Sequence, residues 1–383
     1  MASFAKFGND LFTGRRQIDF IGKRRRWYLV SLVLIVLALI GIFGRGLNFS
    51  LEFTGGSEVR VASVSSAQMA DYDQRARDTV RQATGSDDNL IITKLGDDTV
   101  RVQSEKLGNG SAAATEQVRV ALAKQFQVPE SAVTTQFIGP SWGETVTRKA
   151  IIALIVFLVL VSVVLAIYFR TWTMAAAAVI ALLHDLIITV GIYALTGLEV
   201  SPATMIGFLT ILGYSMYDTV VVFDKVRENT QDAARTGRRT YAQAANYAVN
   251  QTLVRSINTS VVALLPIAAL LVVGYFFIGP GTLLDLSLAL FIGIAVGTYS
   301  SIFVATPVLA SLRSREPVIK EQDRRALAYQ AAQSKALDEV GGQHSSAESI
   351  SGVIEPEQEK AVANAQSRAR TRRDIHPRAK RED

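Results

Sequence analysis

Long apolar runs, separated by polar segments, dominate the pattern of this sequence. Six runs reach or approach the roughly 18–20 apolar residues that a helix needs to cross the hydrocarbon core of a bilayer. Between the first and second runs lies a polar segment long enough for a small domain. The pattern therefore predicts an α-helical polytopic membrane protein with six transmembrane helices. The predicted spans are residues 27–43, 150–169, 174–195, 203–223, 253–277 and 283–312.

The first apolar run follows a basic cluster at residues 23–26, as the hydrophobic part of a signal peptide would. However, no small-x-small cleavage site follows it, and the basic segment before it is long for a signal peptide. We therefore expect an uncleaved membrane anchor.

The distribution of lysine and arginine predicts the orientation, because short cytoplasmic loops carry an excess of these residues. Basic residues are frequent in three polar segments, whereas residues 196–202 and 279–282 contain none. Both termini are therefore expected in the cytoplasm. The segment 44–149 is then extracytoplasmic. It also contains basic residues, but the rule does not apply to loops of this length. The predicted cytoplasmic parts are the N-terminal segment 1–26, the loop 224–252 and the tail 313–383.

The outer segment 44–149 has the alternating pattern of a small α+β domain. Its predicted elements follow the order β-α-β-β-α-β, which is that of a ferredoxin-like module. Such a fold alone does not indicate a function. The predicted strands are residues 57–63, 89–93, 99–103 and 133–138, and the predicted helices are 67–83 and 112–126.

The tail from residue 313 is polar and charged, and Tyr329 is its only aromatic residue apart from histidine. We expect it to be largely disordered, with at most a short helix near residues 324–339. A solvated tail is the simpler interpretation. The alternative is that its basic end, around residues 368–373, docks on lipid or ribosomal RNA.

Composition excludes several classes of function. The formal net charge is +6, but many basic residues flank the spans, so anionic lipid head groups are the expected partner and no nucleic acid is expected. There is no cysteine, hence no disulfide or thiol chemistry. There is no G-x-x-x-x-G-K-[ST] loop, and two of the three histidines, His344 and His376, lie in the tail. The sequence predicts no enzyme, no cofactor and no metal site.

Four ionisable residues in the apolar runs are the candidates for a functional site. His184 and Asp185 lie midway along the third span, Asp218 lies in the fourth, and Arg255 begins the fifth from the cytoplasmic side. A charge at the bilayer centre costs about 2.5–3.5 kcal/mol on insertion scales, so such residues usually face a bundle interior and mark ion or proton paths. Asp218 lies about 7 Å from the cytoplasmic end of its helix at a rise of about 1.5 Å per residue, a depth that Arg255 can share.

The neighbours of Asp218 predict a polar seam between the fourth and fifth helices. Spacing by three and four residues places each set of polar side chains on one helix face, and Gly207 and Gly213 would allow a close helix approach. A proton-linked switch at Asp218 is the main hypothesis. The alternatives are a structural ion pair with Arg255, an Arg255 that extends to the interface, and a His184–Asp185 packing pair. The predicted seam comprises Thr210, Tyr214, Asp218, Arg255, Asn258 and Thr259.

Four short stretches resemble the motifs of one known family, the SecD/SecF proteins of the bacterial Sec export machinery. They occur in the family's order and span about residues 48–307. One departure precedes Asp218: relatives often have asparagine where this chain has Tyr217, which leaves open any role for that neighbour. The stretches are GYSMYDTVVVFDKVREN (213–229, like the fourth-helix motif), LEFTGGS (51–57, like the F-x-G-G segment), ALLHD (181–185, like the third-helix motif) and QTLVRS (251–256, like the start of the fifth helix).

The resemblance implies a SecF-type protein translocase subunit of the RND superfamily, one six-helix half of a transporter whose other half is SecD. It implies work in the bacterial cytoplasmic membrane with the SecYEG channel and SecA on an unfolded preprotein. The proton motive force would promote late, ATP-independent steps of translocation. By motif, Asp218 and Arg255 fall on the family's intramembrane charged sites. We therefore expect Asp218 to bind a proton, release Arg255 and let two helices shift.

Two other functions fit part of the pattern. A small-molecule or lipid exporter of the same superfamily would use the same proton relay, but it would have larger outer domains with a deep apolar pocket. A structural scaffold of the channel complex would tolerate changes at Asp218. It would depend instead on the outer domain and the first helix for assembly.

Overall fold

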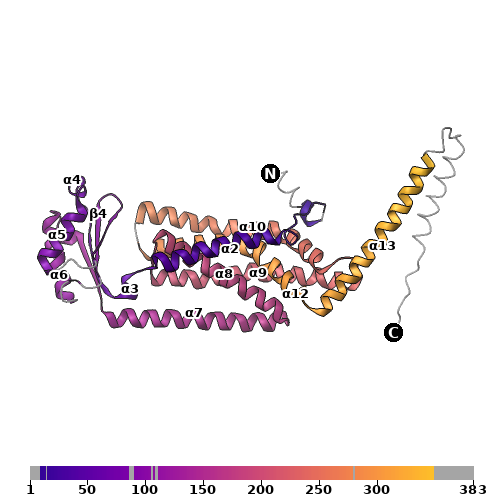
Figure 1. Ribbon diagram of the computed structural model, residues 1–383. Coiled ribbons are helices and arrows are strands. Elements are labelled where there is room, and N and C mark those ends of the chain that lie inside the picture. Colours follow the sequence, from indigo (N-terminus) through magenta and orange to yellow (C-terminus); the bar gives the residue numbers. More distant parts are fainter. Residues whose placement is uncertain are drawn as a thin grey trace, which may run out of the picture. The chain divides into compact units, whose positions relative to one another are not determined.

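The chain forms two compact units, Met1–Asp323 and Arg324–Asp383. The first unit contains all the strands and the six long apolar helices (Figure 1). The computed structural model describes residues 9–13, 15–85, 90–104, 107, 111–278 and 281–348.

Six helical segments of the described chain are long and apolar enough to cross a membrane, in agreement with the sequence pattern. Two of them end in π-helical turns, and a third contains such a turn between two α-helices. The segments are α2 (Arg24–Ile40) with η1 (Gly41–Arg45), α7 (Pro140–Phe169), α8 (Trp172–Thr196), α9 (Pro202–Thr236), α10 (Tyr241–Val273) with η3 (Gly274–Ile278), and α11 (Thr282–Ser300) with η4 (Ser301–Ala305) and α12 (Thr306–Arg313).

The predicted cytoplasmic loop at residues 224–252 is almost entirely helical. α9 continues to Thr236, and α10 already begins at Tyr241. The apolar run sets only the length that suits a membrane, whereas the helix continues as long as local sequence favours it. It ends where Gly237 adopts a left-handed conformation, and a capping box of Thr240 and Gln243 starts the next helix.

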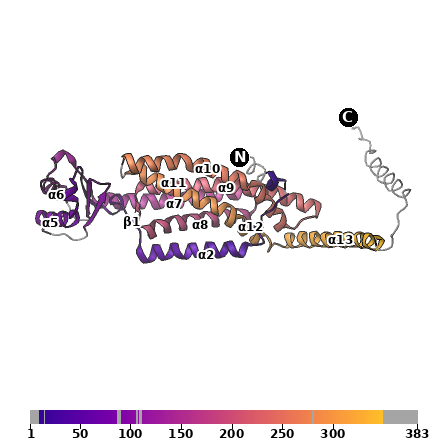
Figure 2. The ribbon, with the colours of Figure 1, turned by 90° about the horizontal axis from the view of Figure 1, so that it is seen from above.

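Three of the long segments form the centre of the bundle. In their most apolar stretches, 56% of α8, 50% of α9 and 50% of α11–α12 is buried, against 17% of α2 and 11% each of α7 and α10. Figure 2 shows α2 beside α8 and α10 on the opposite side of the central helices. Polar groups on the central helices are therefore shielded, while α2, α7 and α10 present apolar side chains outward.

Glycine permits the closest approaches within the bundle. An added Cβ at Gly207 would lie 2.6 Å from Ala289 Cβ, and one at Gly293 would lie 2.2 Å from Ile211 Cδ1. Both contacts join α9 to α11, not to α10 as the sequence pattern predicts for Gly207. Nothing lies within 4 Å of a Cβ at Gly213, so this glycine does not serve a close approach inside the chain.

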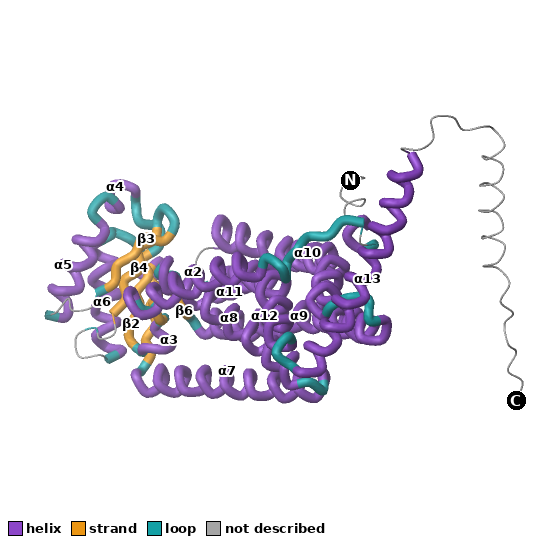
Figure 3. The backbone as a smooth tube through the Cα atoms, turned by 45° about the vertical axis from the view of Figure 1, so that its right-hand side comes forward, coloured by secondary structure: helices purple, strands orange, loops and turns teal. Residues whose placement is uncertain are grey.

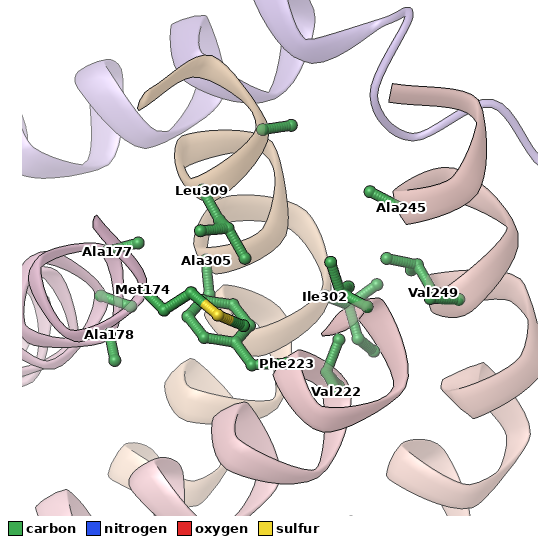
Figure 4. Close-up of a cluster of buried hydrophobic side chains, with 14 of the residues drawn as sticks. Met174, Ala177, Ala178, Val222, Phe223, Ala245, Val249, Ile302, Ala305 and Leu309 are labelled. Atoms are coloured by element: carbon green, nitrogen blue, oxygen red, sulfur yellow. The ribbon is translucent and has the colours of Figure 1, made fainter. Parts of the chain in front are cut away.

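An apolar core joins α8, α9, α10 and the η4–α12 turn (Figure 4). Small residues of α8 leave room for the larger side chains of α9 and of the η4–α12 turn, which is why the segments interdigitate here. The labelled side chains are Met174, Ala177 and Ala178 of α8, Val222 and Phe223 of α9, Ala245 and Val249 of α10, and Ile302, Ala305 and Leu309 of η4–α12.

Two asparagines of α10 hold the N-terminal segment against this core. Asn246 Oδ1 accepts from the backbone N–H of Phe20 at 2.8 Å, and Asn250 Oδ1 accepts from that of Ile18 at 2.8 Å. Both side-chain amides also donate to the carbonyl oxygen of Ile18. Part of the predicted N-terminal segment 1–26 is therefore docked on the bundle.

Residues 44–149 contain a four-stranded antiparallel sheet, and α5 and α6 are the two longest α-helices that lie wholly between its strands (Figure 3). The strand order is β3-β4-β2-β5, and the register pairs Val59 with Val102 and Val61 with Val100. These four valines are fully buried. The elements are α3 (Leu51–Thr54), β2 (Gly56–Val61), α4 (Ser66–Met69), α5 (Tyr72–Thr84), β3 (Ile91–Leu95), β4 (Thr99–Ser104), α6 (Ala112–Gln125), η2 (Glu130–Ala132) and β5 (Val133–Ile138).

Two features join this sheet to the bundle. β1 (Asn48–Phe49) pairs in parallel with β6 (Glu199–Val200), which directly precedes α9. Arg101 of β4 donates to Glu199 at 2.7 Å and to the Oε1 of Gln103, also at 2.7 Å. A largely buried ion pair therefore connects β4 with β6, the strand that directly precedes α9.

Replacing Arg101 with methionine is expected to lower the free energy of unfolding by about 2 kcal/mol, because charge-assisted hydrogen bonds contribute about 1.5–3 kcal/mol. The side chain of Arg101 is 12% exposed and that of Glu199 is 24% exposed, so solvent screens the pair only in part. Thermal unfolding of the purified chain in detergent measures the loss. The matched control is Lys94→Met, whose partner Asp97 is fully exposed and whose loss should change little.

The tail differs from the sequence-based prediction. Instead of at most a short helix near residues 324–339, it forms α13 (Pro317–Glu348). The segment is rich in alanine, lysine, arginine, glutamine and glutamate, all strong helix formers. Its first turns belong to the bundle, since Asp323 Oδ1 accepts from the backbone N–H of Tyr241 at 2.7 Å. The remainder of the predicted disordered tail, residues 349–383, lies outside the described residues.

A buried carboxylate and hydroxyl network in the bundle

Asp218 of α9 is buried where three segments meet. Its side chain is only 7% exposed. Ser256 of α10 donates to Asp218 Oδ1 at 2.7 Å, and Ser301 at the start of η4 donates to Asp218 Oδ2 at 2.5 Å. Both carboxylate oxygens are therefore held by neutral hydroxyl groups from two different neighbours.

Asp185 of α8 is fully buried and forms a second, similar centre. Ser215 of α9 donates to its Oδ2 at 2.5 Å, and its Oδ1 lies 3.1 Å from Nδ1 of His184. The two predicted residues His184 and Asp185 are thus in contact with each other. Asp185 also contacts α9, through the hydroxyl of Ser215.

The two centres are linked through α9. Ser215 and Asp218 are three residues apart and therefore lie on the same helix face. The polar line continues beyond Asp218 along α10, where Ser260 follows Ser256 by one turn and accepts from Thr298 of α11 at 2.7 Å. Hydroxyl and carboxylate groups thus form two hydrogen-bonded clusters inside an apolar bundle, one between α8 and α9 and the other among α9, α10, α11 and η4.

The predicted partner of Asp218 is wrong. Arg255 is exposed, and no ion pair joins it to Asp218, both of which belong to the described chain. Helix phase explains this: consecutive residues are separated by about 100°, and Ser256 occupies the inward face. In α10 the buried positions Leu253, Ser256 and Ser260 are spaced by three and four residues, whereas Arg255 points out of the bundle.

The other predicted seam residues are also divided, because some contact the neighbouring helix and others are exposed. Tyr214 does reach α10, where its hydroxyl donates to the carbonyl oxygen of Thr259 at 3.1 Å. Thr259 itself donates to the carbonyl oxygen of Arg255. Thr210 and Asn258 are exposed, and the hydroxyl of Thr210 donates within its own helix to Ile206. Only the Tyr214–Thr259 contact of the seam crosses between the helices.

His184 faces an aromatic group on its other side. Its ring stacks at 6.4 Å from that of Tyr299, which stacks in turn at 5.2 Å on Phe303. His184 is 4% exposed, and its Nε2 has no hydrogen-bond partner in the described part of the chain. The imidazole therefore contacts the Asp185 carboxylate on one side and the ring of Tyr299 on the other.

Sequence reasoning missed the three serines that hold the carboxylates. Ser215 precedes Asp218 by one turn, and Ser256 follows Arg255 within the same short motif, so helical phase could have identified both. Ser301 carries no such signal, because the π-helical turn at η4 changes the phase that a regular helix would predict. No group of three or more histidine, aspartate or glutamate side chains in the described residues could hold a metal ion.

Two family models match the chain. The model described as protein export membrane protein SecD/SecF, C-terminal, covers residues 118–315, and the SecD/SecF GG motif covers residues 40–67. Two relatives are named protein translocase subunit SecF. The one from Streptomyces coelicolor is 45% identical over 86% of this chain and 86% of its own length. The one from Mycobacterium tuberculosis is 40% identical over 94% of this chain and 83% of its own length.

A solved structure is also similar. The crystal structure of SecDF from Thermus thermophilus, described as a translocon-associated membrane protein, matches with a TM-score of 0.65 at 34% identity. The match covers 78% of this chain and 39% of the larger SecDF chain. All these similarities indicate a multi-pass membrane protein with a role in protein export. The chain therefore belongs to the SecF branch of the SecD/SecF family of protein export membrane proteins.

Proposed function

We propose that this chain, paired with SecD, uses the proton motive force to promote late, ATP-independent steps of preprotein translocation across the bacterial cytoplasmic membrane. One observation carries the proposal: two buried carboxylates, Asp185 and Asp218, are joined to several helices by hydroxyl groups. Neither forms an ion pair with lysine or arginine in the described chain. A buried carboxylate without a cation is costly when charged, and proton binding removes that cost.

Proton binding at Asp218 changes the contacts between helices. The charged carboxylate accepts from Ser256 and from Ser301, whereas the protonated form has one oxygen that is now a donor. The hydrogen bond at that oxygen then reverses, so the carboxyl donates to the serine and the serine must donate its own proton to another acceptor, which favours a shift of α9 against α10 or η4. η4 suits such a shift, since π-helical turns inside helices often occur at functional sites. In this mechanism the serines replace Arg255 as the groups that sense the proton.

The available energy is sufficient for a two-state switch. One charge that crosses a potential of 100 mV gains about 2.3 kcal/mol. That amount changes an equilibrium by about fiftyfold, whereas a shift from 1:99 to 99:1 requires about 5.5 kcal/mol. Two protons that cross this potential supply about 4.6 kcal/mol, and a pH difference across the membrane supplies the remainder.

SecD is the proposed partner because this chain leaves polar side chains exposed at membrane depth. Thr210, Arg255 and Asn258 are exposed on α9 and α10, and lipid would be an unfavourable environment for them. In the Thermus thermophilus relative, a single SecDF chain contains the segment that matches this protein. The SecYEG channel, SecA and anionic lipids are further proposed partners, with both termini of the chain in the cytoplasm.

The sheet domain is proposed to lie outside the membrane and to bind the unfolded preprotein. Its strand order, with β2 and β4 in the centre and β3 and β5 at the edges, supports a ferredoxin-like module. The Arg101–Glu199 pair and the β1–β6 pairing give a route by which motion of α9 reaches this domain.

Export into inverted membrane vesicles tests this function. With SecYEG, SecA, SecD and this chain present, a proton gradient is expected to speed the ATP-independent completion of export severalfold, and a protonophore should abolish the gain. Vesicles that contain SecD but lack this chain should show no such gain. Equal gradient dependence with and without the chain would contradict the proposal.

A further inference from the structure

A polar cavity lies between the sheet domain and the outer ends of the membrane helices. Its volume is about 520 Å³. Four carboxylates line it, but only two arginines: Arg101 pairs with Glu199, and Arg60 pairs with Glu58. The other two carboxylates, Glu52 and Asp285, have no ion pair with any described residue. The cavity therefore has an excess of negative charge, which raises the local concentration of protons.

A line of hydroxyl groups leads from this cavity into the bundle. Ser201, the N-cap of α9, lines the cavity, and its hydroxyl lies 3.2 Å from that of Thr204 one turn below. Thr204 is fully buried beside the hydroxyl of Tyr193 on α8. The ring of Tyr193 also packs edge-to-face on Phe208 at 5.2 Å, which fixes it between α8 and α9.

One face of α8 continues this line to the buried carboxylate. Tyr193, Thr189 and Asp185 are spaced by four residues, so they lie one above the other on the helix. All three are at most 2% exposed. The hydroxyl of Thr189 is buried and has no hydrogen-bond partner within the described residues. A buried hydroxyl without a partner is costly, so this position favours a transient partner such as water.

The line is closed in this conformation. Asp185, Thr189, Phe208 and Ile211 border a narrow gap between α8 and α9 that has no room for a water molecule. A small separation of the two helices would let water fill the space between Thr189 and Asp185. Phe208 and Ile211 thus stand where a gate would be needed to prevent a continuous leak of protons.

We propose that protons from outside enter through the acidic cavity and pass Thr204, Tyr193 and Thr189 to Asp185, and from there Ser215 to Asp218. Each hydroxyl accepts one proton and releases one, so none changes its charge after a transfer. The proposal rests on the proposed function, because it specifies the outer path to the same carboxylates. It also assigns Thr189 and Tyr193 a role that side-chain packing alone does not require.

Single-cysteine labelling tests whether water reaches this line. The chain contains no cysteine, so Thr189→Cys introduces one thiol without further changes in this protein. The matched control is Ile188→Cys, which is adjacent, at the same depth and also buried, but on a different face of α8. In membranes that contain the whole complex, a small cationic methanethiosulfonate reagent is applied from the outside. Labelling of this chain is followed by mass spectrometry.

Thr189→Cys is expected to react at least tenfold faster than Ile188→Cys, and faster still with an inward proton gradient. Equal rates, or no reaction at position 189, would overturn the path. This readout does not depend on export, so it stands apart from the test of the proposed function.

Export kinetics give the second test. Thr189→Val and Tyr193→Phe keep the shape of each side chain but remove the hydroxyl, and each should reduce the gradient-dependent part of export at least fivefold. Thr189→Ser restores a hydroxyl and should retain it. If Asp218→Asn abolishes the gradient-dependent part while Thr189→Val and Tyr193→Phe stay within twofold of wild type, the path is wrong and the proposed function stands. If wild-type export shows no gradient dependence, the proposed function fails.

Discussion

Asp218→Asn is expected to abolish the gradient-dependent part of export while the protein still folds and co-purifies with SecD. Asparagine has nearly the same size, so the α9–α10–η4 contact is retained. However, its amide cannot exchange a proton, and its nitrogen cannot accept from a serine as a carboxylate oxygen does. The variant is therefore fixed in one state. The measurement is the rate of export into inverted vesicles, which should equal that of wild type treated with a protonophore.

Two companion variants separate the role of the carboxylate from that of its surroundings. Ser301→Ala keeps the titrating group but removes one donor, so gradient-dependent export should fall only severalfold. Arg255→Gln should leave the Asp218 contacts intact, because Arg255 is exposed. If Asp218→Asn responds normally to the proton gradient, Asp218 does not relay protons, and the structural scaffold becomes the better explanation. If Arg255→Gln assembles normally but loses all gradient-dependent export, Arg255 takes part in the mechanism.

Sequence periodicity finds the membrane helices because their apolar runs must match a bilayer of fixed thickness. Outside the apolar runs the bilayer sets no limit on helix length, and there the sequence does not predict where the helices end. The extension of α9 to Thr236 and the start of α10 at Tyr241 depend on capping residues and helix-forming side chains in water. α13 is longer than predicted for the same reason. Low hydrophobicity argues for disorder, but it does not oppose a helix made of strong helix formers.

The candidate site shows a different limit. The sequence identifies Asp185 and Asp218, because a carboxylate in an apolar run is conspicuous and costly. It does not identify their partners, because charge complementarity suggests arginine, whereas burial selects small hydroxyl side chains that fit between closely packed helices. Ser256 and Arg255 are neighbours in sequence, but they face opposite environments. The choice between them depends on helical phase, which the buried pattern of α10 reveals only over several turns.

The contact between α2 and α8 connects the helix that carries Asp185 with the segment that leads to the sheet domain. α2 buries few residues, among them Ala38 and Gly41, and both pack against α8 near Gly191. Motion of the central helices can therefore reach α2, and from there β1 and the sheet, only as long as these backbones stay close. The requirement is strictest at Gly191, where an added Cβ would meet the backbone of Ala38.

Gly191→Leu is therefore expected to detach α2 from α8 and to destabilise the whole chain. A Cβ at Gly191 would lie 2.1 Å from Ala38 Cβ and 2.4 Å from Ala38 Cα, so the backbone of α2 itself must move. Overpacking of this kind costs about 1–3 kcal/mol, which lowers the apparent Tm of the purified chain in detergent by several degrees. Gly213→Leu is the matched control, because nothing lies within 4 Å of a Cβ there. If both variants melt with the wild type, the close approach of α2 to α8 at Gly191 is not required for stability.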